Sequence, residues 1–156
     1  MRLFVAVYPP DDVRRDLRRR LGAVATKRLT ALEKWHITLA FLGEVPPDGL
    51  PAALATVPVP KGRELRIRGG GSFHRRVTWA GVEGELGDVA ADVRAALAGA
   101  GVSCDARPFT PHLTVMYAHD EAVLTALADY EGPAWTLDSI ELVRSEAGVY
   151  TTLWRS

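Results

Sequence analysis

Apolar and polar side chains alternate along several short stretches of the chain, a period of two that is typical of half-buried β-strands. This alternation predicts strands at residues 2–7, 35–42, 64–68, 77–82, 111–117, 139–144 and 149–154. Apolar residues recur at helical spacing in four other stretches, at residues 11–24, 50–56, 86–97 and 122–130. Asp11 or Asp12 is the expected N-cap of the first helix, because a short carboxylate can accept the free N–H groups there.

The order of these elements indicates an α+β fold. The predicted strands lack the long apolar runs of an all-parallel sheet, and strands and helices are interleaved. Three consecutive glycines at 69–71 predict a break after the strand at 64–68, and the Lys-Ser/Thr that completes a phosphate-binding loop does not follow them. No linker or low-complexity stretch divides the chain, so we expect one domain over residues 1–156.

Composition restricts the class of protein. The 156 residues are 47% hydrophobic and 24% charged, which excludes intrinsic disorder. No apolar run approaches the roughly 20 residues that cross a bilayer, so we expect a cytoplasmic protein that does not bind membranes. The only cysteine, Cys104, excludes an internal disulfide framework and a cysteine-based zinc site.

The distribution of charge points to a local anion site. The chain has a formal net charge of zero, but residues 1–78 hold 15 basic and 7 acidic side chains, and residues 79–156 hold 4 and 12. Overall neutrality disfavours extended binding to nucleic acid, whereas a basic half can still present one face that attracts phosphate.

A four-residue pattern of histidine, aliphatic, threonine, aliphatic occurs twice, at 36–39 and at 112–115. The copies are 76 residues apart, close to half the chain length, which indicates an internal duplication. Within a strand, His36 and Thr38 share one face and the aliphatic residues take the other, and the same holds for His112 and Thr114. Two such strands related by a pseudo-two-fold axis would surround one cleft.

These side chains suit phosphodiester chemistry. One imidazole can take a proton from water while the other protonates a leaving oxygen, and threonine hydroxyls can donate to phosphoryl oxygens. A single strand histidine is usually structural, but two matched copies disfavour that interpretation. Zinc would need three or four ligands, and His74, His119 and Cys104 show no ligand-like spacing. We therefore expect no metal and no cofactor.

The sequence resembles the RNA 2′,3′-cyclic phosphodiesterases, the 2′-5′ RNA ligase-like branch of the two-histidine (2H) phosphoesterases. The segments that carry the resemblance are RLFVA at 2–6, HITLAFLGEV at 36–45, SF at 72–73, WAGV at 79–82, RPFTPHLTV at 107–115 and ELVRS at 141–145, with Gly148 and Tyr150. It implies two pseudo-symmetric lobes with antiparallel sheets, flanked by helices, around a central cleft. It also implies hydrolysis of RNA or nucleotide 2′,3′-cyclic phosphates to 2′-phosphates.

The resemblance also implies individual roles. His36 would be the proton donor to the leaving 3′ oxygen, and His112 would be the proton acceptor that activates water. Thr38 and Thr114 would hold the phosphate. Phe41 matches a position that stacks on the nucleobase, although strict alternation would place it on the face opposite His36, so this role requires a bulge or a strand end there.

One position departs from the family pattern. Tyr117 stands where the family usually carries an arginine that touches the phosphate. A tyrosine can donate one hydrogen bond but brings no positive charge. Arg107 is the nearest basic residue of that segment and either compensates for the charge or braces the loop.

Two other functions remain open at this point. The same residues would serve a 2′-5′ RNA ligase that joins a cyclic phosphate to a 5′-hydroxyl. The loss of the arginine at position 117 would also suit a non-catalytic module that binds RNA ends or cyclic nucleotides. In each case the partner is an RNA end or a small nucleotide, and we expect a monomer.

Overall fold

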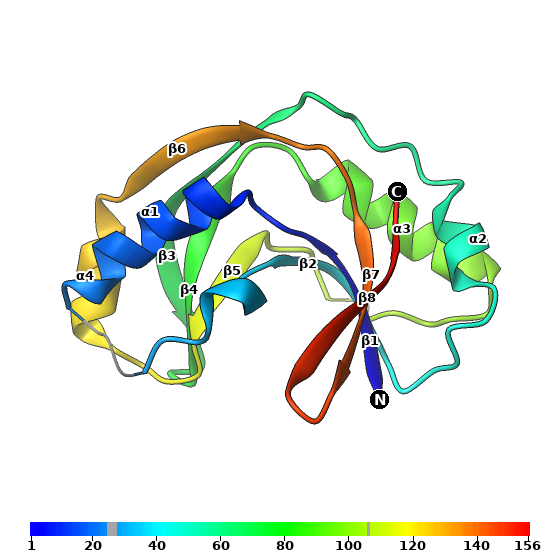
Figure 1. The fold of residues 1–156 in the computed structure, drawn as a ribbon, viewed down its shortest axis with the longest axis horizontal. Helices are drawn as coiled ribbons and strands as arrows, with labels where there is room; N and C mark the ends of the chain where they lie inside the picture. Colours follow the sequence, from blue (N-terminus) through cyan, green and yellow to red (C-terminus); the bar gives the residue numbers. More distant parts are fainter. Residues whose placement is uncertain (25–27, 106) are drawn as a thin grey trace.

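The computed structural model describes residues 1–24, 28–105 and 107–156 (Figure 1). Its strands are β1 (Arg2–Val7), β2 (Ile37–Gly43), β3 (Glu64–Phe73), β4 (Val77–Glu83), β5 (His112–Met116), β6 (Glu131–Thr136), β7 (Glu141–Glu146) and β8 (Val149–Arg155). Its helices are α1 (Asp11–Gly22), α2 (Leu50–Leu54), α3 (Gly87–Gly99) and α4 (Glu121–Ala128), with a 3₁₀ turn η1 (Leu32–Lys34).

The described strands form one antiparallel sheet in the order β6-β3-β4-β5-β2-β1-β7-β8. The predicted α+β class with antiparallel strands is thus confirmed. The two halves of the sheet meet where β2 pairs with β5 through a single residue pair, Ile37 with Leu113. The sheet is therefore continuous, and its two central strands are the two that carry the repeated motif.

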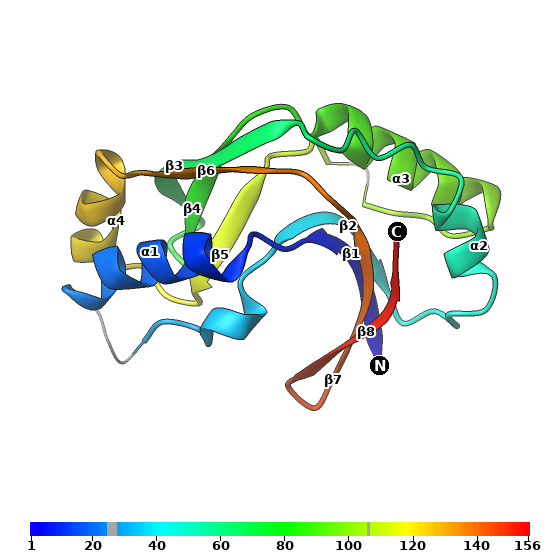
Figure 2. The same cartoon turned by 45° about the horizontal axis from the view of Figure 1, so that its top comes forward.

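The halves of the sheet do not coincide with the halves of the sequence. The half built from β3, β4, β5 and β6 comes from the middle of the chain, and the other half comes from both ends. Helix α1, which follows β1, packs on β6, whereas α3, which follows β4, packs on β2. Figure 2 shows α1 and α4 together at one end of the curved sheet and α2 and α3 at the other. Each half of the sheet is therefore covered by a helix that follows a strand of the other half. The uneven distribution of charge along the sequence thus does not separate the two halves of the sheet.

A large apolar core extends through the described part of the molecule, and a smaller cluster of Phe4, Ala6 and Val143 lies apart from it. The large core contains fully buried side chains from both halves, including Leu17, Trp35, Leu65 and Leu97. Helix α1 places Val13, Leu17 and Leu21 in this core, as its periodicity predicts, while Val24 is exposed. In the ranges that the structure describes, every helix is too short or too polar to span a bilayer.

The glycine triplet does not break the strand. β3 runs through all three glycines, with a register shift against β4 between Ile67 and Gly70. A Cβ on Gly70 would lie 2.5 Å from the carbonyl oxygen of Trp79, and one on Gly71 would lie 2.6 Å from the Trp79 ring. The predicted break was wrong because these glycines allow close packing within the sheet rather than ending it.

Two further predictions differ from the structure. The N-cap of α1 is Pro10, so Asp11 and Asp12 lie in the first helical turn, where they still oppose the helix dipole. The strand β6 was not predicted, because Gly132 and Pro133 interrupt it and its buried positions do not alternate. As the terminal strand of the sheet it tolerates a proline that lacks an N–H donor.

Candidate active site

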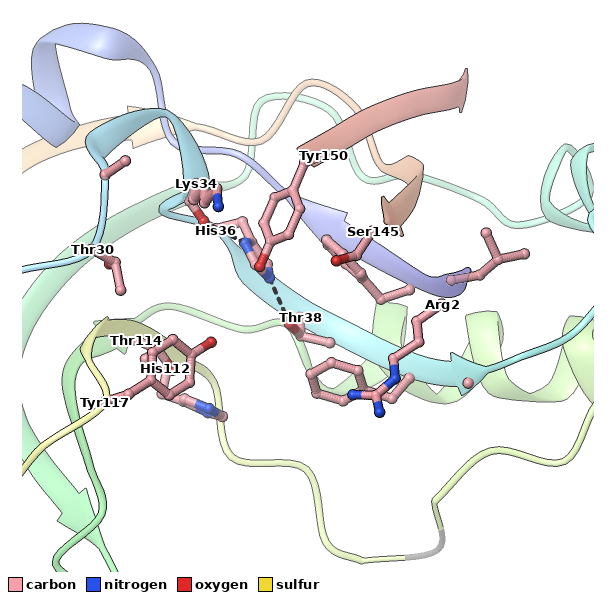
Figure 3. A pocket seen from close by; sticks show the side chains of 15 residues that line it. Arg2, Thr30, Lys34, His36, Thr38, His112, Thr114, Tyr117, Ser145 and Tyr150 are labelled. Atoms are coloured by element: carbon pink, nitrogen blue, oxygen red, sulfur yellow. Dashed lines mark hydrogen bonds between the residues drawn. The ribbon is translucent and has the colours of Figure 1, made fainter. Parts of the chain in front are cut away.

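The site is centred on the Ile37–Leu113 pair between β2 and β5. Both of these side chains are fully buried on the helix-covered face of the sheet. Antiparallel pairing then brings position 36 toward 114 and position 38 toward 112 on the opposite face. Figure 3 shows His36 and Thr38 on one side of the resulting cavity and His112, Thr114 and Tyr117 on the other. The alternation read from the sequence is thus realised, with a local two-fold axis through the central pair.

His36 is held from both ring nitrogens. Its Nδ1 donates to the backbone carbonyl of Lys34 over 2.7 Å, because a carbonyl can only accept. Its Nε2 then accepts from the Thr38 hydroxyl over 2.9 Å. The Phe4 ring stacks on the imidazole with 4.7 Å between centroids, and the Tyr150 ring lies at 72° to the imidazole with 5.7 Å between centroids. These contacts fix the ring orientation and leave the neutral tautomer protonated at Nδ1.

Burial lowers the pKa of His36 to about 4, because the imidazolium would lose hydration without gaining a carboxylate. The hydrogen bond to the Lys34 carbonyl raises this pKa, and a positive charge on the nearby His112 lowers it further. Without a bound anion His36 is therefore neutral at physiological pH.

His112 is oriented in the same way. Its Nδ1 donates over 2.7 Å to the carbonyl of Thr110, two residues earlier, as His36 does to Lys34. The Phe73 ring is nearly perpendicular to the imidazole, with 5.0 Å between ring centroids, and the centroid of the Trp79 ring lies 5.8 Å away. Among the described residues, no group hydrogen-bonds Nε2 of His112. In the neutral tautomer that atom is a free acceptor, as required of a general base.

Both histidines and both threonines line one cavity of about 840 Å³. It lies between the segment around η1, the strands β1, β2 and β5, and the hairpin of β7 and β8. Arg2, Lys34 and Tyr150 also line it. Burial raises the pKa of the Tyr150 phenol, so its hydroxyl remains a hydrogen-bond donor. A cavity of this size, with several donors directed into it, suits a nucleotide-sized anion.

Lys34 and Arg2 are lining cations that the sequence analysis missed. The Nζ of Lys34 lies 5.2 Å from the centroid of the Tyr150 ring, toward the hairpin of β7 and β8. No carboxylate of the described residues lies within 4.0 Å of that ammonium. Strand alternation could not have identified Lys34, because it lies in the 3₁₀ turn η1 before β2 begins at Ile37.

Phe41 reaches the cavity because the strand is irregular. The pairing of β1 with β2 shifts register twice, between Val5 and Ala6 and between Leu3 and Phe4. As a result Leu39 and Ala40 are both buried, and Phe41 returns to the histidine face with 60% of its surface exposed. The bulge that a base-stacking Phe41 requires is therefore present.

The structure separates Tyr117 from Arg107. Tyr117 follows β5, lines the cavity with the histidines and is 71% exposed. Arg107 instead lines a neighbouring cavity and is held by Asp105, whose Oδ2 accepts from its Nε over 2.7 Å. Arg107 therefore does not replace a charge at position 117, although it braces its loop.

The described residues contain no group of three or more His, Cys, Asp or Glu side chains arranged to hold a metal ion. His119 lies apart from the cavity, where its Nε2 contacts Glu121 and its Nδ1 contacts Ser72. His74 lies in the turn between β3 and β4 with a positive φ of 52°.

Comparison with known proteins shows the family of the chain. A family model described as the 2′-5′ RNA ligase superfamily matches residues 9–149, and the chain belongs to that family. The chain is 32% identical over 143 residues to an RNA 2′,3′-cyclic phosphodiesterase of Aeropyrum pernix, covering 78% of this chain and 81% of that protein. It is 36% identical over 126 residues to the protein of that name from Archaeoglobus fulgidus, covering 74% and 71%.

A third relative is matched over a shorter segment. An RNA 2′,3′-cyclic phosphodiesterase of Geobacillus stearothermophilus is 40% identical over 95 residues, which are 53% of this chain and 30% of that protein. The match thus spans less than a third of the length of that relative.

Solved structures share the whole fold. Protein TT0787 of Thermus thermophilus superposes with a TM-score of 0.80 at 28% identity, covering 99% of this chain and 96% of that one. E. coli LigT complexed with 3′-AMP gives a TM-score of 0.76 at 26% identity, covering 99% and 95%.

Proposed function

We propose that the protein hydrolyses 2′,3′-cyclic phosphates at RNA ends or on nucleotides, producing 2′-phosphates. The observation that carries this proposal is the pair of oriented imidazoles, one from each of two paired strands, that line one cavity. The relatives named as RNA 2′,3′-cyclic phosphodiesterases support the same substrate class.

In the proposed reaction, Nε2 of His112 takes a proton from a water molecule. The water oxygen bonds to phosphorus as the bond from phosphorus to the 3′ oxygen breaks. His36 gives its proton to the leaving 3′ oxygen. Thr38 and Thr114 donate to the non-bridging oxygens, where negative charge is concentrated. After the reaction His112 is protonated and His36 is neutral. Proton exchange with solvent must therefore restore both histidines before the next turnover.

His36 must be protonated to act as the acid, yet its pKa is about 4 when no anion lies beside it. A bound phosphodiester brings a negative charge beside the ring, and an opposite charge within roughly 4–6 Å raises the pKa of an imidazole. Substrate binding would also draw the Thr38 hydroxyl from Nε2 to the phosphate and free Nε2 for a proton. The acid role of His36 is therefore coupled to binding of the anion.

Lys34 supplies the positive charge that Tyr117 does not. Its ammonium lines the same cavity as both histidines. An ammonium without a carboxylate partner is available to a phosphate, and a hydrogen bond to a charged group contributes about 1.5–3 kcal/mol. Arg2 lines the cavity as well and is the second candidate cation.

Hydrolysis of a 2′,3′-cyclic mononucleotide in EDTA tests the proposal. His36→Ala and His112→Ala should each lose nearly all activity while their circular dichroism spectra remain those of the folded protein. His119→Gln is the matched control, because His119 lines neither cavity, and it should keep activity. Product analysis should find the 2′-phosphate. Activity retained in either cavity variant, or a 3′-phosphate product, would overturn the mechanism.

A non-catalytic binding module is the second candidate, and the uncharged Tyr117 in the cavity is the observation that favours it. Such a module would bind the cyclic nucleotide and release it unchanged after prolonged incubation. Ligation through the same residues would be detected as joined product when RNA ending in a cyclic phosphate is mixed with RNA bearing a 5′-hydroxyl.

We also propose that the protein acts as a monomer in the cytoplasm. The support for a monomer is that a single chain supplies both histidines to the cavity. Light scattering coupled to size-exclusion chromatography would give its mass, and a dimer would contradict this part of the proposal.

A further inference from the structure

A second cavity of about 480 Å³ adjoins the one that contains both histidines. The two cavities share Thr38, Phe41 and His112, so they meet beside the proposed phosphate position. Each volume falls within the range of roughly 300–1,000 Å³ that holds one small ligand. Together they offer more room than one mononucleotide needs.

The second cavity combines aromatic surface with positive charge. Phe41, Phe73 and Phe109 line it. Phe41 is mostly exposed, so one face of its ring is free to stack on a base. Base stacking on aromatic side chains is the usual way in which proteins hold unpaired RNA.

Two guanidinium groups line the same cavity against one carboxylate. Arg107 is paired with Asp105, which leaves the charge of Arg94 unbalanced. Arg94 donates from a terminal nitrogen to the carbonyl of Arg107 over 3.2 Å, and its guanidinium lies 5.9 Å from the ring centroid of Phe109. Its Nε is buried and has no hydrogen-bond partner among the described residues. This surplus of charge beside an aromatic ring matches a nucleotide phosphate next to its base.

We propose that the second cavity binds the nucleotide that precedes the one bearing the cyclic phosphate, so that the preferred substrate is an RNA end rather than a mononucleotide. This inference rests on the proposed function. The terminal nucleoside occupies the larger cavity, and the chain continues past Phe41 into the second one. The base of the preceding nucleotide stacks on Phe109, and Arg94 faces the phosphate that links the two nucleotides.

The test compares a 2′,3′-cyclic mononucleotide with a dinucleotide that ends in the same cyclic phosphate. The wild-type protein should show a kcat/KM at least about fivefold higher for the dinucleotide, the lower limit of what one stacked base contributes. In Phe109→Ala the ratio of the two kcat/KM values should fall toward one. Val24→Ala, at an exposed apolar position that lines neither cavity, should leave the ratio at the wild-type value.

The outcomes separate this inference from the proposed function. Equal kcat/KM values for both substrates, or an unchanged ratio in Phe109→Ala, would overturn the inference while hydrolysis itself stands. If neither substrate is hydrolysed, the proposed function fails. The inference is then tested by calorimetry with the 2′-phosphorylated mononucleotide and dinucleotide. Tighter binding of the dinucleotide that depends on Phe109 supports it, and equal binding overturns it.

Discussion

Protonation of His36 should destabilise the folded protein when no anion is bound. The pKa of His36 is about 4 in the folded state against an ordinary value of 6.5, and each unit of difference corresponds to about 1.4 kcal/mol. Above pH 6.5 the ring is neutral in both the folded and the unfolded state. Below that pH His36 becomes protonated in the unfolded chain but stays neutral in the folded protein. We therefore expect the folded state to lose about 3 kcal/mol of stability, through this residue, as the pH falls from 7 to 4.

Urea unfolding at a series of pH values measures this loss. Other groups titrate over the same range, so the informative quantity is the difference between the wild type and His36→Gln, which removes only this titration. The free energy of unfolding of the wild type should fall by about 3 kcal/mol more than that of the variant between pH 7 and pH 4. Parallel pH dependences in the two proteins would refute the argument that burial keeps His36 neutral. They would also remove the need for the substrate to raise its pKa.

Four other substitutions test the site and the fold. Lys34→Ala should raise the KM for a cyclic mononucleotide by about tenfold, as expected for one charged hydrogen bond. Tyr117→Arg in that background should restore much of the loss, and a double variant no better than Lys34→Ala would contradict the charge argument. Gly70→Ala should lower the free energy of unfolding by about 1–3 kcal/mol, because its Cβ would lie 2.5 Å from a backbone carbonyl; an unchanged melting temperature would contradict this. Leu97→Ala should cost about 2–5 kcal/mol in urea unfolding through the cavity left in the core, and a loss below about 1 kcal/mol would contradict its burial.

Local patterns in the sequence were sufficient for most of the elements and for the pairing of chemical groups. Side chains alternate in a strand whatever surrounds it, so the spacing of His36 and Thr38 specifies that they share a face. The repeat at His112 and Thr114 extends this to a second strand. The periodicity of Val13, Leu17 and Leu21 likewise specified a buried helix face, since 3.6 residues per turn is a local property of the backbone.

Other features depend on contacts between distant segments, which local patterns do not encode. The sequence alone predicts a strand break at the glycines of β3. Their role in close packing against Trp79 of β4 follows only from the folded structure. The strand β6 is recognisable only from its pairing with β3. Helices α1 and α3 pack on opposite halves of the sheet, because burial of their apolar faces is decided by the whole assembly.

The sequence by itself determined which groups are the candidates for the proposed chemistry, namely two imidazoles and two hydroxyls on matching strand faces. Only the tertiary structure decided how they work together. The pairing of Ile37 with Leu113 brings both strands to one cavity, and the irregular pairing of β1 with β2 turns Phe41 into it. The packing of Phe4 and Tyr150 buries His36 and lowers its pKa to about 4. Desolvation and approach of charge arise from neighbours that are distant in sequence, so both become visible only when the chain has folded.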